Sequence, residues 1–228
     1  MNFDFLPKYL PYFNDGMLVT ILISAFVVLI GTLLGIVTAL GKLSKVAPVR
    51  WLANIYIELF RGTPMLVQIM LGFALLGNSS FPTFQVGILQ QDLGRLLPGI
   101  LVLALNSGAY MAEIVRAGIE AVPAGQREAA YSLGIRPTQT MLTVILPQAI
   151  RNILPAVGNE FVTIIKDSSL LYTIGVMEVF NGAQTVVNLT YQTVSPMLFV
   201  AFYYFVVTFV VSRLLSLLEK KFGKGYAK

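Results

Sequence analysis

The sequence predicts an all-α, polytopic membrane protein that crosses the bilayer five times. Its 228 residues are 56% hydrophobic and only 12% charged, with a mean hydropathy of +0.76. An ordinary soluble domain carries about 25% charged residues, so lipid is the expected solvent. Four uncharged or nearly uncharged stretches, and a fifth with polar interruptions, each reach the roughly 20 residues needed to cross hydrocarbon as a helix. We therefore treat residues 1–228 as a single membrane domain.

The predicted spans cover about residues 17–40, 55–77, 96–119, 150–175 and 196–218. The first span carries no charge, is too long for a cleaved signal peptide and lacks the basic leader of one, so we expect it to be retained. The second span begins with Glu58 and Arg61, whose spacing suits a local ion pair. Glu113 and Arg116 have the same spacing at the end of the third span. An odd number of spans places the two termini on opposite sides of the membrane.

Basic residues indicate which side is cytoplasmic, because Lys and Arg are enriched in short cytoplasmic connections. They gather after the first span, after the third span and in the tail: Lys42, Lys45, Arg50, Arg127, Arg136, Lys220, Lys221, Lys224 and Lys228. We therefore expect the N-terminus outside and the C-terminus in the cytoplasm. These regions supply much of the net charge of +5, and no nucleic-acid partner is predicted.

The chain has no Cys and no His, which removes the thiol and imidazole chemistries. We predict no metal site and no catalytic residue. A phosphate-binding loop is missing too, because Gly41-Lys42 is followed by Leu43 where that loop has Ser or Thr. The chain is thus not expected to hydrolyse ATP or to act as an enzyme.

A polar segment, residues 123–147, separates the third and fourth spans and must lie in water. Pro123 suits the start of a short helix, and Gly134 suits the left-handed residue that ends one. Pro137 can begin a second arm, and Pro147 marks the start of the fourth span. We expect Ala129, Ala130 and Leu133 to form a small apolar patch on the first arm, with Glu128 near the positive end of that helix.

This segment resembles the Glu-Ala-Ala loop of ABC importer membrane subunits, in which a coupling helix docks into a groove of the ATPase. It matches the family pattern at Glu128, Ala129, Ala130, Gly134, Leu146 and Pro147, and has Val144 where the family usually has Ile. Residues 61–64 (Arg-Gly-Thr-Pro), 106–110 (Asn-Ser-Gly-Ala-Tyr) with Glu113, and 166–170 (Lys-Asp-Ser-Ser-Leu) resemble the polar amino-acid permeases, the histidine, glutamine and arginine group.

The resemblance implies a type I ABC importer in a bacterial cytoplasmic membrane. Such an importer would contain a second copy or paralogue of this permease and two ATP-binding cassette subunits, which bind ATP and Mg²⁺. An extracytoplasmic amino-acid-binding protein would deliver the substrate. The residues expected to couple to the ATPase are Glu128, Ala129, Ala130, Leu133 and Gly134.

A substrate site is predicted near the middle of the bilayer, where ionisable groups are costly unless they are paired or face a cavity. Glu160 lies about ten residues into the fourth span, which is near the midplane at 1.5 Å per residue. The predicted substrate-binding residues are Asn106, Ser107, Tyr110, Asn159 and Glu160. Such a site suits a zwitterion, and a carboxylate favours a cationic amino acid (arginine, lysine or ornithine) over glutamine. The alternative for Glu160 is a structural role, paired with a helix neighbour or a backbone group.

Two other classes stay open on the sequence alone. A stand-alone secondary carrier or channel would usually show inverted internal repeats, and none is detectable in five unequal spans. A membrane enzyme would need a Ser, Asp or Lys constellation, and no spacing here suggests one.

Overall fold

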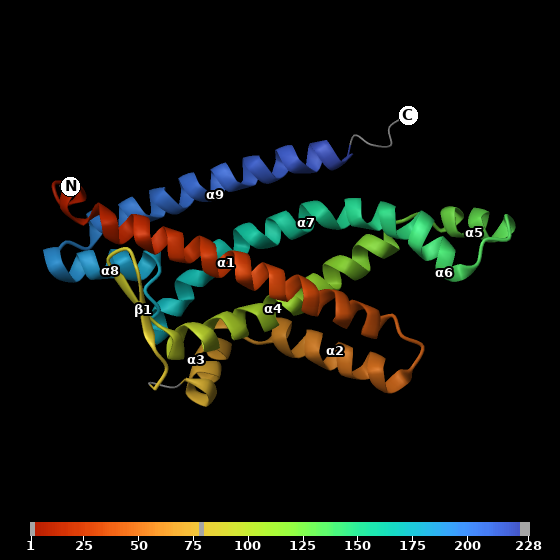
Figure 1. The fold of residues 1–228 in the computed structure, drawn as a ribbon, viewed down its shortest axis with the longest axis horizontal. Coiled ribbons are helices and arrows are strands. Elements are labelled where there is room, and N and C mark those ends of the chain that lie inside the picture. Colours follow the sequence, from red (N-terminus) through yellow and green to blue (C-terminus); the bar gives the residue numbers. More distant parts are fainter. Residues whose placement is uncertain (1–2, 78–79, 224–228) are drawn as a thin grey trace.

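The computed structural model describes residues 3–77 and 80–223, and it is helical apart from one β-hairpin (Figure 1). Lys224 and Lys228 of the basic tail lie outside the described residues. The elements in chain order are α1 (Leu6–Lys42), α2 (Ala47–Gly62), α3 (Met65–Leu76), β1 (Thr83–Val86), β2 (Leu89–Asp92), α4 (Leu93–Glu120), α5 (Ala124–Ser132), α6 (Pro137–Thr140), the π-helical turn η1 (Met141–Ile145), α7 (Leu146–Asp167), the 3₁₀ helix η2 (Ser168–Ile174), α8 (Val179–Thr190) and α9 (Val194–Gly223).

Within residues 3–77 and 80–223, four helices are long and apolar enough to cross a membrane: α1, α4, the continuous helix Pro137–Ile174 and α9. The bent pair α2 and α3 adds a fifth span if it is counted as one. The predicted segment 55–77 is therefore two helices, which meet at an angle of 108°. Pro64 explains the break, because proline has no N–H for a helical hydrogen bond and forces the preceding residue into an extended conformation. Thr63 is indeed extended, with φ −118° and ψ 148°.

The β-hairpin between α3 and α4 is not among the sequence predictions. Its strands pair antiparallel from Thr83 opposite Asp92 to Val86 opposite Leu89. Gly87 turns the chain with a φ of +59°, and the neighbouring Ile88 N–H donates to Asp15 Oδ2 of α1 at 2.8 Å. A side chain at position 87 would meet the Asp15 carboxylate at 2.0 Å, so only glycine fits this contact.

The core lies mainly between α1 and α4, which cross in close contact (Figure 1). The small residues of α1 allow this close approach: a Cβ added to Gly35 would lie 2.3 Å from Cβ of Met111. Gly31 packs in the same way on Ser107. Small residues every fourth position therefore serve packing within the subunit.

Ion pairs join the last turns of α1 and α4, close to residues 123–147, which are called the coupling segment from here on. Glu113 pairs with Arg116 at 2.8 Å, as its spacing predicts, and it also pairs with Lys42 of α1. The predicted Glu58–Arg61 pair is absent from the described residues, because Arg61 turns toward α4 instead. Lys166 and Asp167 likewise form no ion pair in the part of the chain that the structure describes.

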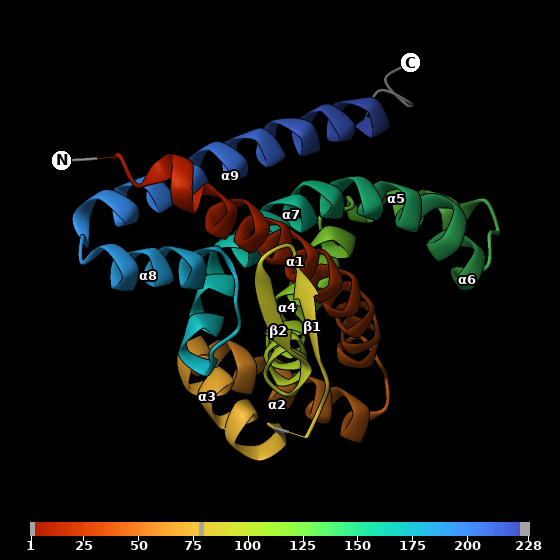
Figure 2. The same cartoon turned by 60° about the vertical axis from the view of Figure 1, so that its left-hand side comes forward.

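α8 leads directly into α9 (Figure 2), and a buried carboxylate holds the two helices together. Glu178 accepts hydrogen bonds from the backbone N–H groups of Phe180 and Asn181, each at 2.8 Å, and from the Tyr204 hydroxyl at 3.2 Å. Burial raises the pKa of Glu178 to about 8, although the three hydrogen bonds act in the opposite direction.

Candidate functional site

Ser107 and Glu160 meet between the middle of α4 and the middle of α7. The Ser107 hydroxyl donates to Glu160 Oε1 at 3.0 Å. Ser107 is fully buried and Glu160 is half-buried. No Lys or Arg side chain in the described residues forms an ion pair with Glu160. The structure thus brings together two residues that the sequence predicts for one site, and it leaves the carboxylate without a cation.

Asn106 faces the break between α2 and α3 and makes two structural hydrogen bonds. Its Nδ2 donates to the Phe60 carbonyl at 3.0 Å and to Gln68 Oε1 at 2.9 Å. The Phe60 carbonyl would normally accept from the N–H four residues later, but that residue is Pro64. The Asn106 amide therefore satisfies a carbonyl that the proline leaves free.

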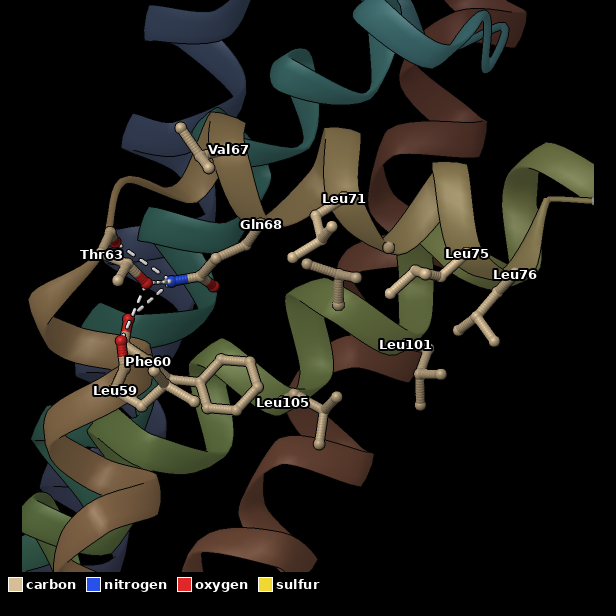
Figure 3. A pocket seen from close by; sticks show the side chains of 12 residues that line it. Leu59, Phe60, Thr63, Val67, Gln68, Leu71, Leu75, Leu76, Leu101 and Leu105 are labelled. Carbon is tan, nitrogen blue, oxygen red and sulfur yellow. Dashed lines mark hydrogen bonds between the residues drawn. The ribbon is translucent and has the colours of Figure 1, made fainter.

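Gln68 of α3 binds the same break in the second span (Figure 3). The sequence analysis did not single out this residue. Its Nε2 lies 2.8 Å from the Phe60 carbonyl, 2.7 Å from Thr63 Oγ1 and 3.1 Å from the Thr63 carbonyl. A polar amide four residues after a proline, in an otherwise apolar stretch, was the available signal. Gln68 and Asn106 together hold the bend of the second span against α4.

A pocket of about 290 Å³ opens beside this bend (Figure 3). Leucines of α2, α3 and α4 form much of its wall, and Gln68 and Thr63 are its polar members. No charged side chain lines it. Neither Ser107 nor Glu160 belongs to its lining, so this pocket is distinct from the predicted substrate site.

Tyr110 and Asn159 are both exposed, and Tyr110 contacts Arg61 of the Arg-Gly-Thr-Pro motif. The Arg61 guanidinium carbon lies 5.1 Å from the centroid of the Tyr110 ring. Asn159 precedes Glu160 on α7, and successive helical side chains point about 100° apart. Its side chain makes no hydrogen bond within the described residues, so the structure does not join it to the Ser107–Glu160 contact.

The coupling segment projects at the end of the molecule opposite the N-terminus (Figure 1). As expected, α5 begins directly after Pro123 and is closed by Gly134, whose φ is +74°. The Ile135 N–H then donates to the Ala130 carbonyl at 3.1 Å, the bond that typically ends a helix with a left-handed glycine.

The apolar patch predicted on α5 is only partly correct. Leu133 is 79% exposed and Ala129 is exposed, but Ala130 is 4% exposed and faces inward. The reason is that α5 packs on the π-helical turn η1, a tertiary contact that covers Ala130's side of the helix. Ala129, Leu133 and the exposed Glu128 remain available to a partner.

Comparison with known families gives the observation that identifies the chain. The model of the family described as "Binding-protein-dependent transport system inner membrane component" matches residues 31–224. The chain belongs to this family. It is a permease subunit of an amino-acid ABC importer and an integral protein of the bacterial inner membrane.

Relatives of this permease align along almost its whole length. The arginine transport system permease protein ArtQ of Bacillus subtilis (strain 168) is 34% identical over 224 residues, which are 97% of this chain and 98% of ArtQ. The putative glutamine transport system permease protein GlnP of Rickettsia conorii is 36% identical over 223 residues, 96% of this chain and 98% of that one. A crystal structure of an amino acid ABC transporter with histidines contains a chain that is 42% identical and superposes with a TM-score of 0.85, covering 97% of this permease and 100% of that chain.

Proposed function

We propose that this permease subunit imports cationic amino acids (arginine, lysine or ornithine), or glutamine as the second choice, through a site between α4 and α7. The proposal rests on the contact between Ser107 and Glu160. This contact places a carboxylate that has no cationic partner between two membrane-crossing helices, near the middle of each. Tyr110 forms part of the same site, and Asn106 and Asn159 lie at its edges. The relatives support an amino-acid substrate, since they are named for arginine and glutamine and also for cystine and for glutamate and aspartate.

The charge of Glu160 favours a cationic substrate on energetic grounds. A carboxylate within a span is costly unless it is paired or faces a cavity. The Ser107 hydroxyl provides one hydrogen bond but no positive charge. An ammonium or guanidinium group of the substrate would supply the missing counter-charge, and its own desolvation would be offset by the pairing.

Transport requires partners that this chain does not contain. In the proposed assembly, two ATP-binding cassette subunits bind ATP and Mg²⁺ and contact Glu128, Ala129, Leu133 and the turn at Gly134. A second copy or paralogue of the permease completes the membrane part, and an extracytoplasmic binding protein delivers the amino acid. In this assembly the N-terminus lies outside and the C-terminus lies in the cytoplasm, because the connections rich in Lys and Arg are placed on the cytoplasmic side.

Alternating access is the proposed mechanism. The ATPases would close on ATP and displace α5, which is connected to α4 on one side and through η1 to α7 on the other. These two helices carry the walls of the site, so a displacement of α5 changes the separation of Ser107 and Glu160. A ligand or nucleotide shifts such an equilibrium only by binding the two states with different affinity.

Reconstitution tests this function directly. The permease is purified with its co-purifying subunits, placed in proteoliposomes and supplied with the binding protein, and uptake of radiolabelled arginine, lysine, ornithine and glutamine is measured with and without ATP. We expect an ATPase to be retained on the permease and uptake to require ATP. Uptake by the purified permease alone, driven by an ion gradient, would instead establish a stand-alone secondary carrier.

A further inference from the structure

A polar cavity of about 370 Å³ lies beside the coupling segment, where α5 packs against η1 and α7 begins. Cavities of about 300–1,000 Å³ commonly bind small ligands. Neither Ser107 nor Glu160 lines this cavity, and it shares no residue with the apolar pocket beside the bend of the second span. Its lining residues come from α5, η1 and α7: Gln126, Thr143, Val144, Pro147, Gln148 and Arg151.

Pro147 explains the local shape of the cavity wall. Proline has no N–H, so the Thr143 carbonyl lacks the donor that a regular α-helix provides four residues later. The Leu146 N–H donates instead to the Met141 carbonyl, five residues earlier, and the turn η1 is π-helical. Single π-helical turns inside α-helices are frequent at functional sites. This wider turn forms part of the cavity wall.

The polar side chains on α7 suit an anion. Arg151 supplies a positive charge, and among the described residues no Asp or Glu lines the cavity. A guanidinium carries five N–H donors, so Arg151 can bind an anion and also keep a partner within the protein. The Gln148 amide donates one hydrogen to the Val144 carbonyl at 2.8 Å and has a second hydrogen for a ligand.

Gln126 brings the start of α5 to the same cavity. Its side chain is exposed and makes no hydrogen bond within residues 3–77 and 80–223, so its amide is available to a ligand. Gln126 belongs to the first turn of α5, which contains no acidic residue and has no side-chain cap. The positive end of this helix therefore adds to the charge of Arg151.

The cavity lies at the depth of the phospholipid headgroups. The helix Pro137–Ile174 has 38 residues, so it is about 57 Å long at 1.5 Å per residue, whereas the hydrocarbon core is about 30 Å thick. The polar coupling segment occupies the Pro137 end, so the excess of about 27 Å, or about 18 residues, is placed there. Arg151 then lies about 6 Å outside the hydrocarbon core, within a headgroup layer that is about 5–8 Å thick on each side.

We propose that this cavity binds a phosphate group, carried either by a phospholipid headgroup or by a soluble phosphate compound. Paired N–H groups of the Arg151 guanidinium match two phosphate oxygens, and the amides of Gln126 and Gln148 donate to the others. The bound phosphate contacts α5 and α7 at once, so it connects the coupling segment to the helix that carries Glu160. The site is independent of which amino acid is transported.

Two ligands distinguish the sources of the phosphate. The permease is purified with its co-purifying subunits in a neutral detergent, delipidated, and titrated with phosphatidylglycerol or with glycerol phosphate. Calorimetry measures the affinity, and native mass spectra count the bound molecules. Binding of phosphatidylglycerol alone assigns the site to a lipid headgroup, and binding of glycerol phosphate within about tenfold of that affinity assigns it to phosphate from either source. If neither ligand binds, the proposal is overturned.

Substitutions at the cavity decide whether the bound ligand occupies it. Arg151→Gln should weaken binding about tenfold or more, and Arg151→Lys should restore only part of the loss, because lysine keeps the charge but lacks the paired N–H groups. Gln126→Ala should weaken binding severalfold. This second variant leaves the fold intact, because the exposed Gln126 side chain has no hydrogen bond to lose within the described residues. Melting temperatures confirm that each variant is folded.

Arg213→Gln is the matched control. Arg213 is an exposed basic residue of α9 that lies over the Phe209 ring, 5.1 Å from its centroid, and it does not line the cavity. We expect this variant to bind the ligand with the affinity of the wild type. An equal loss in Arg213→Gln would overturn the proposal, because binding would then follow the total charge of the protein. Wild-type affinity in both Arg151→Gln and Gln126→Ala would overturn it as well.

Discussion

The Ser107 hydroxyl bonds Glu160 Oε1 across 3.0 Å and so joins the middle of α4 to the middle of α7. These are the two helices that enclose the coupling segment, since α4 ends at Glu120 just before α5 and α7 begins directly after η1. The residues proposed to hold the substrate and the helix proposed to meet the ATPase are therefore connected through the same two rigid elements.

Glu160→Gln should lower uptake of the cationic amino acids about tenfold or more and shift the preference toward glutamine. The change removes a negative charge but keeps the shape, and a hydrogen bond to a charged group contributes about 1.5–3 kcal/mol. Ser107→Ala should have a smaller effect, because it removes a neutral donor. Competition uptake assays with both variants measure this order. An unchanged preference for a cationic amino acid in Glu160→Gln would remove this residue from the site.

Glu128→Lys and Gly134→Asp should uncouple transport from ATP hydrolysis without preventing membrane insertion. Gly134 has a φ of +74°, a conformation that costs an L-residue about 1–2 kcal/mol, and Glu128 is exposed on α5, the helix that Gly134 closes. Uptake and substrate-stimulated ATPase activity are measured together in proteoliposomes. Gly125→Ala is the matched control, because nothing lies within 4 Å of an added Cβ there and its φ is not positive. Normal uptake and stimulated ATPase activity in both variants would refute the coupling role of α5.

Gln68→Leu should destabilise the permease by about 1–3 kcal/mol, the usual cost of leaving polar partners unsatisfied. The Asn106 amide would lose an acceptor, and both the Phe60 carbonyl and Thr63 would lose a donor. Thermal unfolding in detergent should show a lower midpoint temperature. Gln85→Leu is the control, since Gln85 is exposed on β1. Equal midpoints for the two variants would mean that Gln68 does not hold the bend.

Stability should fall as the pH rises toward about 8, because of Glu178. Burial raises its pKa from 4.5 to about 8, so the folded protein holds this proton more tightly than the unfolded chain does. The stabilisation is complete below about pH 4.5 and is lost as the pH passes through about 8. Glu178→Gln should flatten this part of the profile of melting temperature against pH, whereas a change at the exposed Glu58 should not. A slope that persists in Glu178→Gln would assign the effect to another group.

The sequence alone was sufficient for the features that depend on neighbouring residues. The length of each apolar stretch predicted the membrane-crossing segments, because the free energy of moving a helix from water into lipid is a sum over its residues. Pro123 and Gly134 predicted the ends of α5, because each acts through its own backbone conformation. The prediction that Glu113 pairs with Arg116 also holds, since both residues lie on one turn of a single helix.

Only the tertiary structure determined the contacts between distant segments. Pro64 made a break in the second span foreseeable, but the 108° angle and the hydrogen bond between Asn106 and Gln68, which are 38 residues apart, are seen only in the fold. Arg61 turns from its neighbour Glu58 to Tyr110, and Ser107 meets Glu160 across 53 positions. Such pairings follow from how closely whole helices approach, and that approach is set by packing at many residues at once rather than by any local pattern.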